Sequence, residues 1–62
     1  MGKVRSTLIK RTAREMVEKF PERFKRDFSH NKKVLEQLLV FPSKRMLNMV
    51  AGYVTRVVRG EE

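Results

Sequence analysis

Apolar residues recur every three or four positions through the last third of the chain, from Ser43 to Arg59. At about 100° of rotation per residue, they fall on a single arc: Met46, Leu47, Val50, Ala51, Val54, Val57 and Val58. The opposite arc is polar and mostly basic, and comprises Lys44, Arg45, Asn48, Thr55, Arg56 and Arg59. We predict an amphipathic helix here, started by Pro42 and Ser43 and ended by Gly60. The rest of the chain is expected to pack around it.

A second amphipathic pattern begins at Ser6 or Thr7, either of which can cap a helix, and continues to Phe20. Its apolar side comprises Leu8, Ile9, Ala13, Met16 and Phe20. Its polar side comprises Lys10, Arg11, Arg14, Glu15 and Glu18. Pro21 ends this predicted helix. Residues 1–5, before this helix, are predicted to form a short basic arm that is too polar to pack, either as a frayed terminus or as an extension that becomes ordered against phosphates.

The stretch from Glu22 to Asp27 is expected to form a short helical turn. Phe24 and Phe28 are spaced to reach the same side of the chain, and we interpret both rings as wedges in the core. Aromatic residues among arginines and lysines are also typical of surfaces on which nucleic-acid bases stack. We favour the core, because a domain of 62 residues has few large apolar groups to spare.

A third helical pattern runs to about Leu39. Three residues that can cap a helix stand near its start: Asp27, Ser29 and Asn31. Its apolar side comprises Val34, Leu35, Leu38 and Leu39. Lys32 and Lys33 would fall in its first turn, where positive charge opposes the helix dipole. We interpret this mismatch as a sign that the two lysines bind an anion, together with the free N–H groups of the helix end.

These patterns predict an all-α fold: a small three-helix bundle with an additional short helical turn between the first and second main helices. The chain is expected to form a single domain, residues 1–62, with residues 61–62 as a disordered tail. The predicted core comprises Leu8, Ile9, Met16, Phe20, Phe24, Phe28, Leu35, Leu38, Leu39, Val50, Val54 and Val57.

Positive charge dominates the composition: 15 Lys and Arg residues stand against 7 Asp and Glu, which gives a formal net charge of +8. This charge on a small domain implies an anionic partner, and nucleic acid is the first candidate, ahead of an anionic membrane or an acidic protein. Without cysteine, neither disulfides nor thiolate metal sites can stabilise the fold. No apolar run is long enough to span a membrane and no secretory signal is recognisable, so we expect a cytoplasmic protein.

Catalytic chemistry finds little support in this sequence. A catalytic triad needs a nucleophile, a base and an orienting acid, but the single histidine, His30, stands beside a predicted helix cap and is expected to be a surface or capping residue. Three glycines do not make a Gly-rich phosphate loop. The sequence therefore predicts a protein that is not an enzyme and that has no metal site or cofactor.

Basic side chains are the candidate binding groups. They gather on the first helix and at the start of the last one: Lys10, Arg11, Arg14, Lys44 and Arg45. Together they can neutralise several phosphates, which would make binding depend strongly on salt.

Gly52 is unusual, because a glycine inside a helix costs about 1 kcal/mol relative to alanine. Either ribose-phosphate approaches closely there or the defect is tolerated. Beside it, Tyr53 is expected to be half-buried with its hydroxyl facing outward.

Four short motifs give the chain a family resemblance: Gly2-Lys3-Val4-Arg5, Asn31-Lys32-Lys33-Val34, Pro42-Ser43-Lys44-Arg45 and Ala51-Gly52-Tyr53-Val54-Thr55. Over nearly its whole length, the chain resembles small-subunit ribosomal protein seventeen of the archaeal and eukaryotic type, and its short length is similar to that of archaeal members. The resemblance implies a structural protein of the small ribosomal subunit that binds ribosomal RNA and lies among neighbouring ribosomal proteins.

The resemblance also implies RNA contacts at the positions that match these motifs: Lys3, Arg5, Asn31, Lys32, Lys33, Ser43, Lys44, Arg45, Gly52, Tyr53 and Thr55. With the three basic residues of the first helix, these are the predicted RNA-binding residues. Leu47 and Met49 depart from the family pattern, in which basic residues are expected, and they indicate a more apolar edge on the last helix.

Two other functions stay open on the sequence alone. The last two helices and the turn between them have the lengths of a helix-turn-helix DNA-binding protein. However, most of the last helix is apolar, and such a protein would be a dimer, whereas we expect a monomer. The second alternative is a helical adaptor that binds acidic or phosphorylated peptides at its basic faces.

Overall fold

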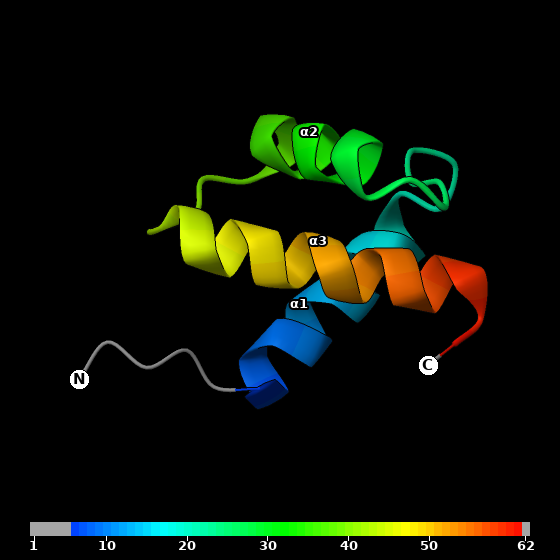
Figure 1. The fold of residues 1–62 in the computed structure, drawn as a ribbon, viewed down its shortest axis with the longest axis horizontal. Helices are drawn as coiled ribbons and strands as arrows, with labels where there is room; N and C mark the ends of the chain where they lie inside the picture. Colours follow the sequence, from blue (N-terminus) through cyan, green and yellow to red (C-terminus); the bar gives the residue numbers. More distant parts are fainter. Residues whose placement is uncertain (1–5, 62) are drawn as a thin grey trace.

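The computed structural model describes residues 6–61, which contain three α-helices and their connections (Figure 1). They are α1 (Ser6–Lys19), α2 (Phe28–Leu38) and α3 (Lys44–Arg59). No strand occurs between residues 6 and 61, so the predicted all-α fold is confirmed. The predicted basic arm, with Lys3 and Arg5, and the last residue, Glu62, lie outside the described residues.

α3 lies at the centre of the bundle. Both other helices pack against it, whereas no Cα atom of α1 comes within 8 Å of one in α2. In Figure 1, α2 runs antiparallel to α3 along one side, and α1 crosses it on another. The prediction that the rest of the chain packs around this helix is therefore confirmed, and α3 is covered on two sides instead of one.

Local signals at both ends of α3 act as the sequence predicts. The Ser43 hydroxyl accepts a hydrogen bond from the N–H of Met46 at 3.2 Å. Gly60 adopts a left-handed conformation, with a φ of 80°, which glycine reaches without steric cost. The N–H of Glu61 then donates to the carbonyl of Arg56 at 2.9 Å, and this contact closes the helix. Glu61 thus contributes a backbone hydrogen bond to the end of α3, and the disorder predicted for residues 61–62 stays a prediction.

The core contains ten buried apolar residues, drawn from all three helices and the connection between the first two. They are Ile9, Ala13, Met16, Phe24, Val34, Leu35, Leu47, Val50, Ala51 and Val54. Phe20, Leu38 and Val57 from the predicted core are half-buried. Three other predictions are wrong: Leu8, Phe28 and Leu39 are 46%, 40% and 37% exposed. All three lie at or next to a helix end, where the core covers them only in part; Phe28 keeps a contact with Gly52 of α3.

The connection between α1 and α2 is less helical than predicted. It begins with one turn, closed by a 3.0 Å hydrogen bond from the N–H of Arg23 to the carbonyl of Phe20, and residues 24–27 are irregular. Phe24 points into the core, since it is only 5% exposed. Asp27 caps α2 by accepting a hydrogen bond from the N–H of Ser29 at 3.0 Å. The connection is therefore held by Phe24 in the core and by Asp27 at the start of α2.

Candidate nucleic-acid interface

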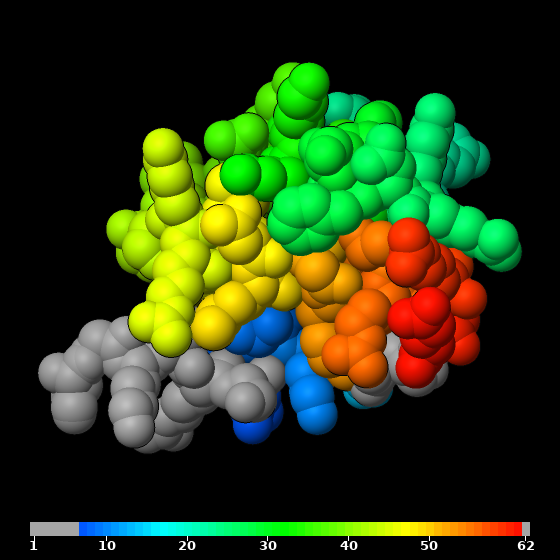
Figure 2. All heavy atoms as spheres, in the orientation of Figure 1, coloured from blue at the N-terminus to red at the C-terminus, as the bar shows by residue number. Residues whose placement is uncertain are grey.

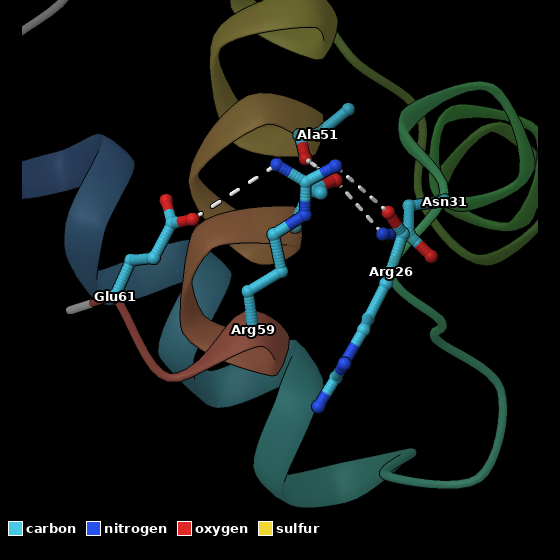
Figure 3. Close-up of polar contacts among 6 residues, drawn as sticks. Arg26, Asn31, Ala51, Arg59 and Glu61 are labelled. Carbon is cyan, nitrogen blue, oxygen red and sulfur yellow. Dashed lines mark hydrogen bonds and ion pairs between the residues drawn. The ribbon is translucent and has the colours of Figure 1, made fainter.

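A buried hydrogen-bond network joins the connection to α2 and α3. The side-chain amide of Asn31 in α2 accepts from the N–H of Lys25 at 2.8 Å and donates to the carbonyl of the same residue at 2.6 Å. It also donates to the Thr55 hydroxyl at 2.9 Å. That hydroxyl donates in turn to the carbonyl of Ala51 at 2.8 Å (Figure 3). The amide of Asn31 thus joins α2 to the connection and to Thr55 of α3, which is 24 residues away in the sequence.

This network corrects two predicted RNA contacts. The exposed fractions of Asn31 and Thr55 are 0% and 5%, and their polar atoms are occupied by protein partners. Neither side chain is accessible to RNA in this structure. Thr55 lies on the polar arc of α3, but α2 covers that part of the arc. Burial of such groups is possible because each is hydrogen-bonded.

Further side chains fix the same connection from outside the core. Nε2 of His30 donates to the carbonyl of Arg23 at 2.9 Å. This histidine is half-buried, and it binds the connection instead of capping a helix. Nη2 of Arg59 donates to the carbonyl of Arg26 at 3.3 Å, as Figure 3 shows. The carbonyls of Arg23, Lys25 and Arg26 therefore all accept hydrogen bonds from side chains of α2 or α3.

Basic side chains gather around this fixed connection. We call them the loop-end cluster: Arg23, Lys25, Arg26, Lys33, Arg56 and Arg59, all of which are exposed. The side chains of Arg23, Lys25 and Lys33 line one shallow depression, together with His30 and the acidic Glu22. Arg59 lies 4.0 Å from Glu61, and the Asp27 carboxylate is engaged as a helix cap. Positive charge is thus concentrated at the end of the bundle where α2 begins and α3 ends.

The loop-end cluster contains five residues that were not predicted as site residues: Arg23, Lys25, Arg26, Arg56 and Arg59. The density of basic residues between positions 23 and 26 is a signal that the sequence offered. That these residues lie near the last turn of α3 could not be predicted from the sequence, because it depends on the antiparallel packing of α2 and α3.

Lys32 and Lys33 do not lie where the sequence argument put them. Because α2 begins at Phe28, both lysines fall in its second turn, and the predicted conflict with the helix dipole at the first turn is wrong. Lys33 is exposed and Lys32 half-exposed. Lys33 is still part of a basic surface, because it lines the same depression as basic residues of the connection; the free N–H groups of the helix end are not involved.

The other predicted basic residues lie in two separate regions. Lys10, Arg11 and Arg14 are exposed on α1 and line a depression that also contains Glu15 and Glu18. Lys44 and Arg45 are exposed at the start of α3, beside the capping Ser43. This helix has 16 residues, which at about 1.5 Å per residue corresponds to about 24 Å. Lys44 and Arg45 are therefore at the far end of α3 from the loop-end cluster.

Gly52 and Tyr53 have protein neighbours in this structure. A Cβ atom added to Gly52 would lie 3.9 Å from Cε1 of Phe28, so the group that approaches this glycine is an aromatic ring of α2. The distance is an ordinary van der Waals contact and leaves room for a methyl group. Tyr53 is half-buried and packs against the core. Its hydroxyl oxygen is buried, so the predicted outward orientation is wrong.

Residues 6–61 contain neither a helix suited to a membrane nor a cluster of metal-binding side chains. No helix in that range is both long and apolar enough to cross a bilayer. Over the same residues, no group of three or more His, Cys, Asp or Glu side chains is placed to hold a metal ion. The site that this part of the chain offers is a basic surface.

Comparison with known proteins identifies the family. A family model described as Ribosomal S17 matches residues 1–60. The chain is 55% identical over 58 residues to the small ribosomal subunit protein eS17 of Staphylothermus marinus, an alignment that covers 94% of this chain and 85% of that protein. It is 53% identical over 62 residues to the eS17 protein of Methanopyrus kandleri, covering 100% and 89%. The eS17 protein of Theileria parva is 49% identical over 59 residues, which are 95% of this chain and 45% of that longer protein. The chain therefore belongs to the ribosomal S17 family, as its four motifs suggested.

Proposed function

We propose that this protein is a structural component of the small ribosomal subunit and that it binds ribosomal RNA through phosphate contacts centred on the loop-end cluster. The observation that carries the proposal is the fixed connection between α1 and α2. Three of its carbonyls accept hydrogen bonds from α2 and α3, while the side chains of Arg23, Lys25 and Arg26 are exposed. The names of the relatives supply the ribosomal context.

A fixed basic loop suits a partner whose backbone has a fixed shape. Phosphate contacts set the position and orientation of a protein on a nucleic acid without reading its sequence, and folded RNA is recognised largely by shape. Binding to a loop that is already ordered loses less conformational entropy than binding to one that must become ordered. The role requires no chemical turnover, so the protein would act as a non-enzymatic part of the assembly.

The basic residues outside the loop-end cluster stay predicted contacts. Lys10, Arg11 and Arg14 would bind a second RNA segment at α1, and Lys44 and Arg45 a third at the start of α3. Several RNA segments and neighbouring ribosomal proteins would then surround the domain in the cytoplasmic ribosome, and the free protein is expected to be a monomer. The helix-turn-helix and peptide-adaptor alternatives have no support from the three relatives named above, which all carry ribosomal names.

Two charge-matched triple variants test the proposal. The first, Arg23→Gln with Lys25→Gln and Arg26→Gln, removes three charges from the connection. The second, Lys10→Gln with Arg11→Gln and Arg14→Gln, removes three charges from α1. Binding to a transcript of the source organism's small-subunit ribosomal RNA is measured across a range of KCl concentrations. Equal losses of charge separate the effect of location from that of net charge.

The connection variant is expected to lower the slope of log affinity against log salt by about 2 to 3, because each lost phosphate contact contributes about 0.7 to 0.9. The α1 variant should show a smaller loss of affinity and slope. Circular dichroism of both variants verifies that they are folded. Wild-type affinity and slope in the connection variant would refute the proposed centre of the interface.

A further inference from the structure

Phe28 is the aromatic residue that the structure leaves most exposed between residues 6 and 61. Its exposed fraction is 40%, against 5% for Phe24, while Phe20, Phe41 and Tyr53 are half-buried against the core. It is the first residue of α2, and the Asp27 cap beside it fixes the backbone there. An aromatic ring at a fixed helix end is therefore presented to solvent.

The inner side of this ring contacts α3 at its one glycine. Cε1 of Phe28 lies next to Gly52, at 3.9 Å from the position of a Cβ atom. In Figure 2, the start of α2 lies against the middle of α3 on the face turned toward the viewer. The ring thus rests on a helix surface that has no side chain at the contact, while 40% of the residue is exposed to solvent.

Each helix carries one cationic residue a single helical turn beyond the Phe28–Gly52 contact. Lys32 follows Phe28 by one helical turn, and Arg56 follows Gly52 by one turn, so each projects on the same face as the residue before it. Met49, one turn before Gly52, is 39% exposed and extends the apolar surface. The nearest acid in sequence is Asp27, whose carboxylate caps α2. The combination is a small apolar platform with positive charge at its borders.

We propose that Phe28 is a stacking platform for an unpaired nucleotide of the ribosomal RNA, with Lys32 and Arg56 bound to the phosphates next to it. The proposal rests on the proposed function and adds the chemistry of one subsite. Exposed aromatic rings within basic surfaces bind single-stranded nucleotides by stacking on the base while cations hold the backbone. An apolar protein surface fits less well, because it would desolvate the two flanking cations without neutralising them.

The test separates an aromatic platform from an apolar cover. Phe28→Leu keeps an apolar side chain over Gly52 but removes the ring, Phe28→Tyr keeps the ring, and Val40→Ala is the control at another exposed apolar residue, which is 99% exposed. Affinity for the same ribosomal RNA transcript is measured. Phe28→Leu should weaken binding by about 5- to 150-fold, the range typical of base stacking on an aromatic residue. Phe28→Tyr and Val40→Ala should bind as the wild type does.

The salt dependence supplies a second readout. The slope of log affinity against log salt should be unchanged in Phe28→Leu, because no phosphate contact is lost. If Phe28→Leu binds as the wild type does while the connection variant is impaired, the platform is refuted and the proposed function stands. If neither variant changes binding, both proposals fail.

Ultraviolet cross-linking of the wild-type complex decides the matter if Phe28→Leu does not fold. Trypsin cleaves after Arg26 and Lys32, so residues 27–32 form one peptide. A nucleotide adduct on Phe28 within this peptide is the expected result. Adducts on other peptides with none on residues 27–32 would overturn the platform.

Discussion

The two helices that pack against α3 do so by different chemistry. Between residues 7 and 19 of α1, the buried residues are all apolar: Ile9, Ala13 and Met16. α2 also buries Val34 and Leu35, but places Asn31 between them and the connection. The amide of Asn31 is completely buried and bonds both to the connection and to α3.

This difference separates stability from positioning. Apolar burial is roughly proportional to area and has no preferred direction, so α1 can stabilise α3 without fixing any loop. Hydrogen bonds have narrow ranges of length and angle, and a buried group that loses its partner is costly. The α2 side can therefore hold the connection in one conformation, which is what a basic loop needs in order to match a fixed phosphate pattern.

Met16→Ala is expected to give the largest loss of stability on the α1 side. Met16 is 6% exposed, and truncation of a buried methionine lowers the free energy of unfolding by about 2 to 5 kcal/mol. Urea denaturation measures this change. Under conditions where the variant is folded, its affinity for ribosomal RNA should equal that of the wild type. A marked loss of affinity would contradict the proposal that α1 contributes to stability and not to the positioning of the RNA-binding connection.

Asn31→Ala should cost less stability but impair binding. The variant loses the bonds to Lys25 and Thr55, and we expect the free energy of unfolding to fall by about 2 kcal/mol. RNA affinity should fall as well, because the connection is released. Thr55→Val is the matched control: it removes the other end of the network but leaves both bonds between Asn31 and Lys25. If Asn31→Ala binds RNA as tightly as Thr55→Val does, the fixed connection has no role in binding.

Gly52→Ala is the smallest expected change and sharpens the comparison at the α2–α3 contact. The methyl group would meet Phe28 at an ordinary contact distance of 3.9 Å. Thermal unfolding should therefore show a gain of about 1 kcal/mol, the difference in helix propensity between the two residues. Affinity for RNA is expected to stay that of the wild type, because the methyl group would lie against the inner side of the Phe28 ring and leave its outer side free. A gain in both stability and affinity would contradict this account.

Local signals made the helices predictable from the sequence. The apolar stripe of α3, the Ser43 cap and the Gly60 stop all depend on residues within a few positions of each other, and all appear in the structure. The burial of Leu35, Val50 and Val54 follows from the same periodicity. These features need no knowledge of which helix packs where.

Burial of polar groups and the place of the site were not predictable in this way. Asn31 and Thr55 have polar side chains, so the sequence pattern placed them outside; only their pairing across 24 positions makes burial favourable. Phe24 and Phe28 have similar surroundings in the sequence, yet only Phe24 is buried in the core. The loop-end cluster likewise combines basic residues of the connection, of α2 and of the last turn of α3, which lie at one end of the bundle because α2 and α3 run antiparallel.

Hydrogen exchange at the backbone amide of Lys25 in the free wild-type protein tests the central claim most directly. This N–H donates to the buried Oδ1 of Asn31 at 2.8 Å, although Lys25 lies outside any helix. We expect it to exchange as slowly as amides in the middle of α2, and to lose that protection in Asn31→Ala. Exchange in the wild type at the rate of an unstructured peptide would show that the network does not hold the connection.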